Sequence, residues 1–228
     1  MNSLSRHPNI VQIFGVYGDI NTIESISKGN TRLYETSPPM IVMEYMEGGT
    51  INDLIYDDMF FYSTLWTKTV YRAIARVANA LSKIHNSHLV HSDIKPQNIF
   101  LTKKPTDPHE LPNVDFKLGD LGSATKEGNK ITQLTIEYSP PEAFVNTASW
   151  SFDIFSLGMT MYVLLTRKLD RPDLQEMNDA FDCFQRGDYA CVRNKISNAQ
   201  NKLRKWDPQV PAEVKPLIKR MLDPDPLN

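Results

Sequence analysis

Three polar residues with a fixed spacing could act together on a phosphate group: Asp93, Lys95 and Asn98. They lie in a polar bend between two short apolar runs, so loop backbone presents all of them. A carboxylate can orient a hydroxyl proton, a lysine can neutralise a transferring phosphate, and a carboxamide oxygen can hold magnesium. The simpler interpretation is a polar turn that only joins two strands. Including His91, however, the pattern has four fixed positions, which match by chance in roughly one chain of this length in a thousand.

The elements that must position this bend are predicted from apolar periodicity. Apolar residues at spacings of four and three predict an amphipathic helix over residues 68–86, with Thr64 or Thr67 as its N-cap. Residues 152–166 are apolar nearly all round, which predicts a helix buried in the core. Strands are predicted at Ile10–Tyr17, Met40–Met43 (as a buried strand), Leu89–Val90, Ile99–Leu101 and Phe116–Leu118, and loops at 21–39 and 103–113.

Residues 91–98 resemble the catalytic loop of protein kinases, H-R-D-L-K-x-x-N. The rest of the chain follows the order of that family. The further segments that resemble its landmarks are His7–Val11 before the fourth strand, Met43–Gly49 at the hinge, Gly119–Gly122 at the D-F-G turn, Thr135–Glu142 at the peptide-positioning loop, Asp153–Gly158 at the buried helix and Leu222–Pro224 near the end. A D-L-G triplet alone is most often just a turn, but this one follows a strand 22 residues after Asn98.

The resemblance implies an α+β, two-lobed kinase fold, with a partial N-lobe and hinge over 1–46 and a mainly helical C-lobe over 47–228. It implies ATP-dependent phosphorylation of protein substrates on Ser or Thr, since lysine two residues after the aspartate is the Ser/Thr form. Asp93 would orient the substrate hydroxyl and Lys95 would stabilise the transferring phosphate. Asn98 and Asp120 would hold Mg²⁺ beside the ATP phosphates. The adenine slot would be lined by Met43, Glu44, Tyr45 and Met46.

The sequence also departs from the family pattern. It has no G-x-G motif, and its first lysine, Lys28, comes after the His7-Pro8 landmark. We therefore expect residues 1–228 alone to bind ATP·Mg²⁺ weakly and to transfer little phosphate. Ser92 replaces the arginine that binds an activation-loop phosphate in many kinases, so activity is expected not to depend on such a phosphate. Leu121 replaces the phenylalanine of D-F-G and leaves the apolar character unchanged.

Composition excludes several classes of function. The net charge is −2, which provides no basic footprint for nucleic acid. The longest apolar stretch, residues 154–165, is too short to insert across a bilayer, and the N-terminus has no signal-peptide core. Cys183 and Cys191 have neither zinc spacing nor the pattern of a disulfide framework, which predicts two reduced thiols in a cytoplasmic or nuclear protein. His85, His88 and His91 are not expected to share a face and bind zinc.

Two further interpretations stay open at this point. A catalytically inactive pseudokinase that binds partners through its C-lobe would explain the missing nucleotide-site motifs. A truncated product of an active enzyme would explain them equally, and it agrees better with the intact Asp93, Lys95, Asn98 and Asp120. A Gly-rich strand and a lysine-bearing strand encoded upstream of Met1 would decide for the enzyme.

Overall fold

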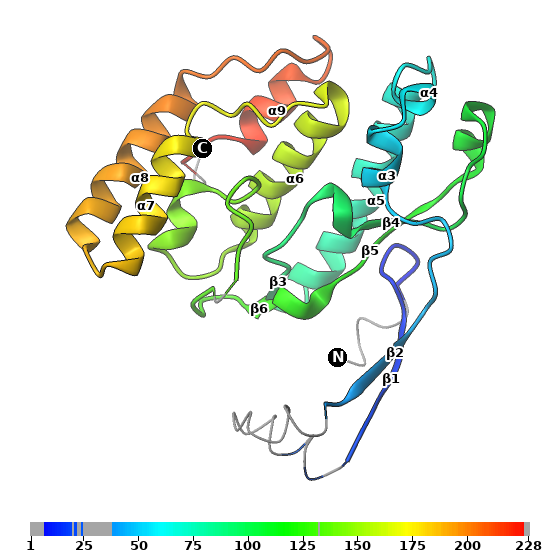
Figure 1. Ribbon diagram of the computed structural model, residues 1–228, viewed down its shortest axis with the longest axis horizontal. Helices are drawn as coiled ribbons and strands as arrows, with labels where there is room; N and C mark the ends of the chain where they lie inside the picture. The colour runs from blue at the N-terminus through cyan, green and yellow to red at the C-terminus, as the bar shows by residue number, and fades with distance from the viewer. Residues whose placement is uncertain (1–6, 20, 22–23, 25–37, 132, 226–228) are drawn as a thin grey trace.

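A long buried helix, α6 (Trp150–Thr166), forms the centre of the computed structural model of this chain, which describes residues 7–19, 21, 24, 38–131 and 133–225. Twelve of its residues are buried, from Phe152 to Leu164. This confirms the core helix predicted over residues 152–166, although the observed helix begins two residues earlier, at Trp150. Figure 1 shows the other helices arranged around α6. Because α6 is enclosed nearly all round, residues at its start can serve as a rigid anchor for neighbouring loops.

Helix α5 (Trp66–His85) packs against α6 and confirms the predicted amphipathic helix. Its apolar stripe is buried, but the predicted threonine cap is wrong, because the N-cap residue is Leu65 and makes no side-chain cap. Tertiary contact sets the start of the helix instead. The indole of Trp66 is buried and donates a 2.8 Å hydrogen bond to the carbonyl of Leu164 at the end of α6. The Oγ of Ser63 accepts from the Leu65 amide, which satisfies one backbone donor ahead of the helix.

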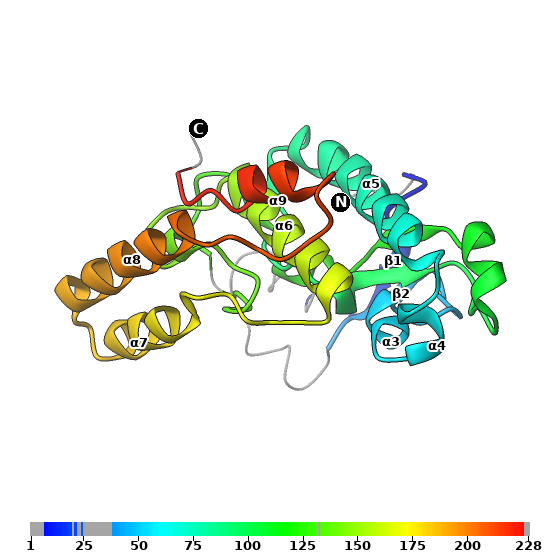
Figure 2. The same ribbon diagram turned by 90° about the horizontal axis from the view of Figure 1, so that it is seen from above.

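The other helices of the described residues are α3 (Ile51–Ile55), α4 (Asp58–Phe61), α7 (Leu174–Gln185), α8 (Tyr189–Arg204) and α9 (Lys215–Met221). Figure 2 shows α7 and α8 at one end of the body, α3 and α4 at the other, and α9 between them beside α6. Thr50 is the N-cap residue of α3 and forms a capping box with Asp53. Helices α7 and α8 pack side by side at one end, and α9 packs against α6. Among the described residues, no helix is both long enough and apolar enough to cross a membrane.

In the part of the chain that the structure describes, the strands form three separate two-stranded antiparallel sheets. They are β1 (Ile13–Tyr17) with β2 (Met40–Met43), β3 (Leu89–Val90) with β6 (Thr125–Lys126), and β4 (Ile99–Leu101) with β5 (Phe116–Leu118). Strands β3 and β4 flank the polar bend but pair with different partners. The bend is therefore held between two sheets, and 3-10 helix η1 (Pro96–Asn98) leads from it into β4. The loop predicted over 103–113 contains η2 (Pro108–Asn113), and the remaining 3-10 helices are η3 (Leu121–Ser123) and η4 (Pro141–Phe144).

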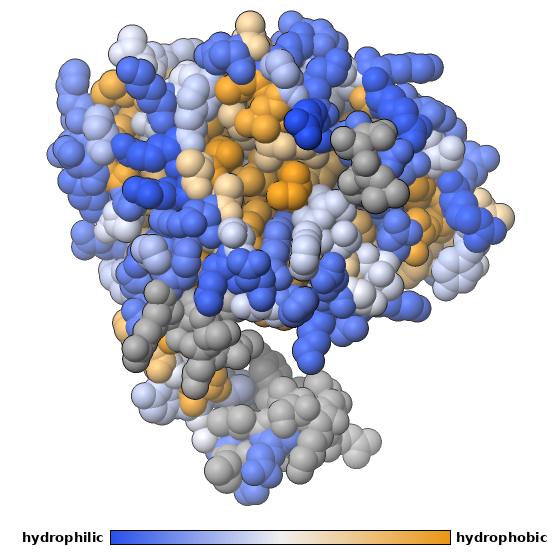
Figure 3. Space-filling model, turned by 180° about the vertical axis from the view of Figure 1, so that it is seen from behind, coloured by the Kyte–Doolittle hydropathy of each residue, from blue (hydrophilic) through white to orange (hydrophobic). Residues whose placement is uncertain are grey.

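The β1–β2 ribbon projects from the helical body (Figure 1), and the prediction that β2 is a buried strand is wrong. All four β2 residues are exposed, with Met40 at 67%. Over the described residues this sheet has only two strands, so its faces are left open. Figure 3 accordingly shows apolar surface on the extension as well as on the body. Strand β1 is shorter than predicted, since Ile10 instead forms an isolated bridge with Leu118. Most of the loop predicted over 21–39 lies outside the described residues.

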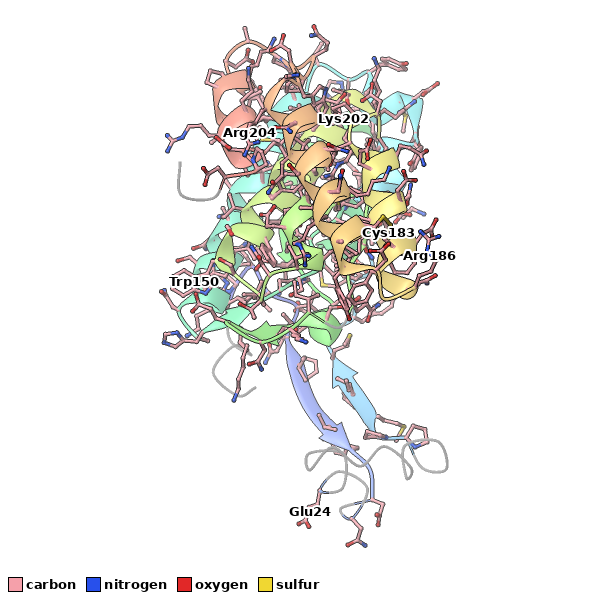
Figure 4. The ribbon with its side chains drawn as sticks, turned by 90° about the vertical axis from the view of Figure 1, so that its left-hand side faces the viewer. Glu24, Trp150, Cys183, Arg186, Lys202 and Arg204 are labelled. Atoms are coloured by element: carbon pink, nitrogen blue, oxygen red, sulfur yellow. A yellow bond between two sulfur atoms is a disulfide. The ribbon has the colours of Figure 1, made fainter. Side chains whose placement is uncertain are left out.

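The two cysteines are joined, so the prediction of free thiols is wrong. A disulfide links Cys183 on α7 to Cys191 on α8. Figure 4 shows the labelled Cys183 on α7 beside α8, near Arg186. The two cysteines are eight residues apart and stand on either side of the turn between α7 and α8. They come within bonding distance because α7 packs on α8, which their spacing alone does not indicate. Among the described residues, no group of three acidic, histidine or cysteine side chains lies close enough together to hold a metal ion.

Candidate active site

The carboxylate of Asp93 lies at the centre of a compact polar cluster. Its Oδ1 accepts a 2.6 Å hydrogen bond from the Thr135 hydroxyl, and its Oδ2 lies 2.8 Å from the Lys95 ammonium. The Asn98 amide donates to Oδ2 at 3.1 Å and to the Asp93 carbonyl at 2.8 Å. Lys95 also donates to the Thr135 hydroxyl at 3.1 Å. The structure thus brings the three predicted residues of the bend together with a fourth, Thr135, from 37 to 42 residues farther along the chain.

The backbone of this bend is fixed from below by the first turn of α6. Asp153, which is fully buried, accepts hydrogen bonds from the backbone N–H groups of His91 at 2.8 Å and Ser92 at 2.9 Å. Ser92 has a φ of 69°, in the left-handed region that non-glycine residues seldom adopt. Two charge-assisted bonds thus hold the peptides that precede His91 and Ser92, and they fix the backbone that leads through this strained residue to Asp93.

Asp153 has a further partner on α5. The Nε2 atom of His85 lies 2.8 Å from Asp153 Oδ2, and the imidazole stacks on the indole of Trp150 with ring centroids 5.7 Å apart. His85 and His91 therefore meet at one carboxylate, although they share no metal site. The sequence resemblance placed Asp153 at the start of the buried helix, and the structure adds that its carboxylate binds both the backbone of the bend and His85 on α5.

The second predicted loop is attached directly to the first. The Nε2 atom of His91 lies 3.0 Å from the carbonyl oxygen of Gly119. The Gly119 amide donates a 2.9 Å hydrogen bond to the carbonyl of Asn98. These two bonds place Asp120 beside Asn98. Asp120 has a φ of 57°, and its Oδ1 accepts from the Gly122 amide at 3.2 Å. Asp120 is exposed and thus lies outside the core.

Asn98, Asp120 and the predicted hinge line one pocket of about 500 Å³. Its lining residues are Val11, Met43, Glu44, Tyr45, Met46, Asn98, Phe100, Gly119 and Asp120. All four hinge residues predicted from the sequence are in this set. The sequence analysis did not predict Val11 and Phe100. Phe100 lies in β4 and Val11 lies just before β1, and because side chains alternate between the two faces of a strand, each could have been expected to face the pocket. Apolar walls with a few polar groups at one end suit a flat aromatic ring that carries phosphates.

Glu44 contributes to this pocket mainly through its backbone, because its side chain is bound elsewhere. The carboxylate accepts from Lys117 at 2.6 Å and from the Gln12 amide at 3.1 Å, and the Glu44 amide donates to the Gln12 carbonyl at 2.7 Å. Burial alone raises the pKa of Glu44, but Lys117 and the Gln12 amide bring that pKa below its ordinary value. The ion pair thereby ties the hinge to β5 and to the start of β1.

The donor set at Asn98 and Asp120 fits a hard divalent cation. With the Asn98 NH₂ group directed at Asp93, its amide oxygen is left for the pocket, and Asp120 supplies an anionic oxygen. Mg²⁺ prefers oxygen ligands and is commonly bound by one or two protein groups plus substrate phosphates and water. Two protein oxygens at the mouth of a nucleotide-sized pocket agree with that pattern.

The ionisation of Asp93 suits a group that receives or orients a proton. Burial raises its pKa, but hydrogen bonds from Lys95, Thr135 and Asn98 and the charge of Lys95 outweigh burial and bring the pKa below its ordinary value. Asp93 is 6% exposed, so the charge is retained in a largely enclosed position. An anionic carboxylate is therefore maintained next to a cation and a hydroxyl, which is an arrangement suited to handling a second hydroxyl group.

Comparison with known proteins agrees with this geometry. The family model of the protein kinase domain matches residues 1–228. The chain is 38% identical to the serine/threonine-protein kinase ArnS of Sulfolobus acidocaldarius over 95% of its own length and 36% of that protein. It is 28% identical to calcium-dependent protein kinase 10 of Arabidopsis thaliana over 99% of its length and 35% of that protein. The chain thus spans about a third of the length of these relatives.

Proposed function

This chain belongs to the protein kinase family, and from that premise we propose that it transfers the γ-phosphate of ATP to Ser or Thr hydroxyls of protein substrates. The observation that carries the proposal is the Asp93 cluster. One carboxylate is bound at the same time by a lysine, a hydroxyl and an amide, each within 3.1 Å. A polar turn that only joined β3 to β4 would have no need of this convergence from three separate positions of the chain.

In this proposal each residue of the cluster has one role. Asp93 orients the substrate hydroxyl and takes up its proton as the oxygen attacks phosphorus. Lys95, whose ammonium lies 2.8 Å from Asp93, would offset the charge of the transferring phosphate. Thr135 holds Asp93 and Lys95 in register, since its hydroxyl donates to one and accepts from the other. Preorganised charges of this kind are typically the largest contribution to such a reaction.

The nucleotide would occupy the pocket beneath the β1–β2 ribbon. Met43 to Met46 would face the adenine, with backbone groups at its edge, and Val11 and Phe100 would cover its faces. Asn98 and Asp120 would hold Mg²⁺, which, when bound, neutralises charge on the phosphates. We place the boundary between the N-lobe part and the C-lobe at residues 46 and 47, where the hinge leads into the Gly48-Gly49 turn. A cytoplasmic location and a lack of nucleic-acid binding remain predictions.

The test is Asp93→Asn in the full-length natural protein, with transfer to a Ser/Thr peptide and ATP affinity both measured. The variant is isosteric but cannot accept the proton, so transfer should fall by about a hundredfold or more. ATP affinity should stay within about twofold, because Asp93 acts on the hydroxyl and not on the nucleotide. The control is Asp107→Asn, which removes an exposed carboxylate at the start of η2, remote from the cluster.

Different failures of this test have different meanings. Near wild-type turnover in Asp93→Asn would refute the role of the cluster. ATP binding by the wild-type protein with no transfer to any peptide would support an inactive pseudokinase that serves as an interaction module. Analysis of the labelled product should find phosphoserine or phosphothreonine. Mainly phosphotyrosine would contradict the role given to Lys95.

A further inference from the structure

A buried arginine outside the Asp93 cluster, Arg171, reaches the segment that leads away from Thr135. Arg171 lies four residues after the C-cap residue of α6, Arg167. Arg167 has a left-handed φ of 57°, which turns the chain back toward the body. Arg171 is 3% exposed and Asp173 is fully buried. A guanidinium in such a place is stable only if it is paired and its N–H groups are satisfied. Its partners therefore show what it holds.

Asp173 fixes the plane of the guanidinium. The Nε of Arg171 donates to Asp173 Oδ1 at 2.8 Å and its Nη2 donates to Oδ2 at 2.5 Å, which makes a bidentate pair. The guanidinium also lies 5.0 Å from the ring centroid of Phe155 on α6. Because both the in-plane and the stacking contacts are set, the remaining nitrogen, Nη1, has a fixed direction.

Nη1 points at the backbone of the predicted peptide-positioning loop. It donates to the carbonyls of Ser139 at 2.8 Å, Glu137 at 3.2 Å and Ile136 at 3.3 Å. These bonds connect residues 32 to 35 positions apart in sequence. Three carbonyls that converge on one nitrogen force residues 136–139 into a tight turn, and this turn begins at the residue after Thr135.

The turn transmits that constraint to the Asp93 cluster. The Thr135 carbonyl accepts from the amides of Tyr138 and Ser139, both at 3.0 Å, and from the Ser139 hydroxyl at 2.8 Å. The backbone of Thr135 is therefore held on one side by the turn, while its hydroxyl binds Asp93 and Lys95 on the other. A continuous path of hydrogen bonds runs from Asp173 through Arg171 and the turn to the proposed catalytic aspartate.

We propose that Arg171 is a positioning residue that braces the substrate-facing segment 135–142 from inside the fold. The inference rests on the proposed kinase function and extends it to regulation. Ser92 offers no guanidinium to a phosphate beside the polar bend, and the Arg171–Asp173 pair supplies an internal cation that needs no modification. The segment is thus held in one conformation by the chain itself, so the enzyme is permanently competent to receive its protein substrate.

The first test needs no enzymatic activity. Hydrogen exchange of backbone amides is measured by mass spectrometry in the full-length protein and in Arg171→Lys. Lysine has a single ammonium nitrogen, which can still pair with Asp173. It has no second nitrogen that could bind the carbonyls of Ile136, Glu137 and Ser139 at the same time. Loss of charge-assisted bonds should speed exchange of amides 136–145 by about tenfold or more, with α5 unchanged. The matched control is Arg72→Lys, since Arg72 binds the carbonyls of Leu111, Pro112 and Val114 in the same manner.

The outcomes of the exchange test separate a brace from a general core residue. Arg72→Lys should speed exchange over 108–114 and leave 136–145 unchanged. Unaltered exchange over 136–145 in Arg171→Lys would overturn the proposal, as would a uniform acceleration that includes α5 and α6. If Arg171→Lys does not fold, the experiment is repeated with Asp173→Asn. This variant keeps the Arg171 guanidinium but holds it less firmly in one orientation. If neither variant folds, the pair is purely structural and the proposal is wrong.

The second test compares two reactions of the same protein. Arg171→Lys should lower kcat/KM for a Ser/Thr peptide by about tenfold or more, through KM because the peptide-facing segment is loosened and through kcat because Thr135 then holds Asp93 less firmly. Hydrolysis of ATP without peptide should stay within about twofold, since Asn98 and Asp120 are untouched. An equal loss in both reactions would overturn the brace. If the wild-type protein transfers no phosphate at all, the kinase proposal fails, and the exchange test alone judges Arg171.

Discussion

The Thr135 hydroxyl donates a 2.6 Å hydrogen bond to Oδ1 of Asp93, which joins the polar bend to a segment 42 residues away. The opposite oxygen, Oδ2, binds Lys95 and Asn98. Each carboxylate oxygen can accept two hydrogen bonds, so Oδ1 still has room for a substrate hydroxyl. Thr135 therefore acts as a fixed neighbour of the incoming group and sets which face of the carboxylate it can approach.

Replacing Thr135 by Ala should lower kcat for peptide phosphorylation by about tenfold to a hundredfold. The hydrogen bond is made to a charged group, and loss of such a bond costs about 1.5–3 kcal/mol. Thr135→Ser keeps the hydroxyl and should retain most activity. The measurement is steady-state kinetics on a Ser/Thr peptide at saturating ATP.

The control for this prediction is Thr125→Ala. Thr125 lies in the same region of the chain, but its hydroxyl donates to the Ser123 carbonyl at 3.1 Å and has no contact with Asp93. It should change kcat by less than about twofold. Equal activity of Thr135→Ala and the wild type would mean that the hydroxyl plays no part in positioning Asp93.

Changing Asp120 to Asn should raise the Mg²⁺ concentration needed for half-maximal transfer. Even changes outside the direct ligands of a metal lower its affinity by about 10–100-fold, so loss of the carboxylate that we propose as a ligand should do at least this. The measurement is a Mg²⁺ titration of initial rate at fixed ATP. Asp115→Asn is the control, because Asp115 pairs with Arg76 at 2.8 Å, away from the pocket. An unchanged Mg²⁺ requirement in Asp120→Asn would remove Asp120 from the metal site.

Local spacing was enough to nominate part of the candidate site. Asp93, Lys95 and Asn98 lie within six residues and were nominated from their pattern, and Asp120 was nominated from the resemblance of Gly119–Gly122 to the D-F-G turn. Helices α5 and α6 were also predicted, because their apolar residues follow helical periodicity over many turns. In each case the information lies in residues that are neighbours in the chain.

The features that sequence reasoning missed depend on contacts between distant segments. Arg171 has no motif around it, and its role appears only when the turn at 136–139 is folded against it. The disulfide of Cys183 required α7 to pack on α8. The exposure of β2 could not be predicted from its apolar residues, because burial is decided by what covers a strand and not by its composition.

The last prediction concerns Glu142, a buried carboxyl at the end of the peptide-positioning loop. It is 6% exposed, and among the described residues its Oε2 has no hydrogen-bond partner. Burial raises the pKa of Glu142 from 4.5 to about 7; its own backbone amide and Arg171 oppose the rise and Asp225 adds to it. A raised pKa means that the folded state holds the proton more tightly than the unfolded state. Stability should therefore fall as pH rises from about 4.5 to about 7.

Glu142→Gln removes this titration, so its benefit relative to the wild type should grow with pH. From the two pKa values, the difference in unfolding free energy between variant and wild type should increase by about 2–3 kcal/mol between pH 5 and pH 8. Urea unfolding at both pH values measures it. The exposed Glu47→Gln is the control and should show little change. A Glu142→Gln effect that is equal at both pH values would show that Glu142 is ionised alike in the folded and unfolded states, so that its burial carries no free-energy penalty.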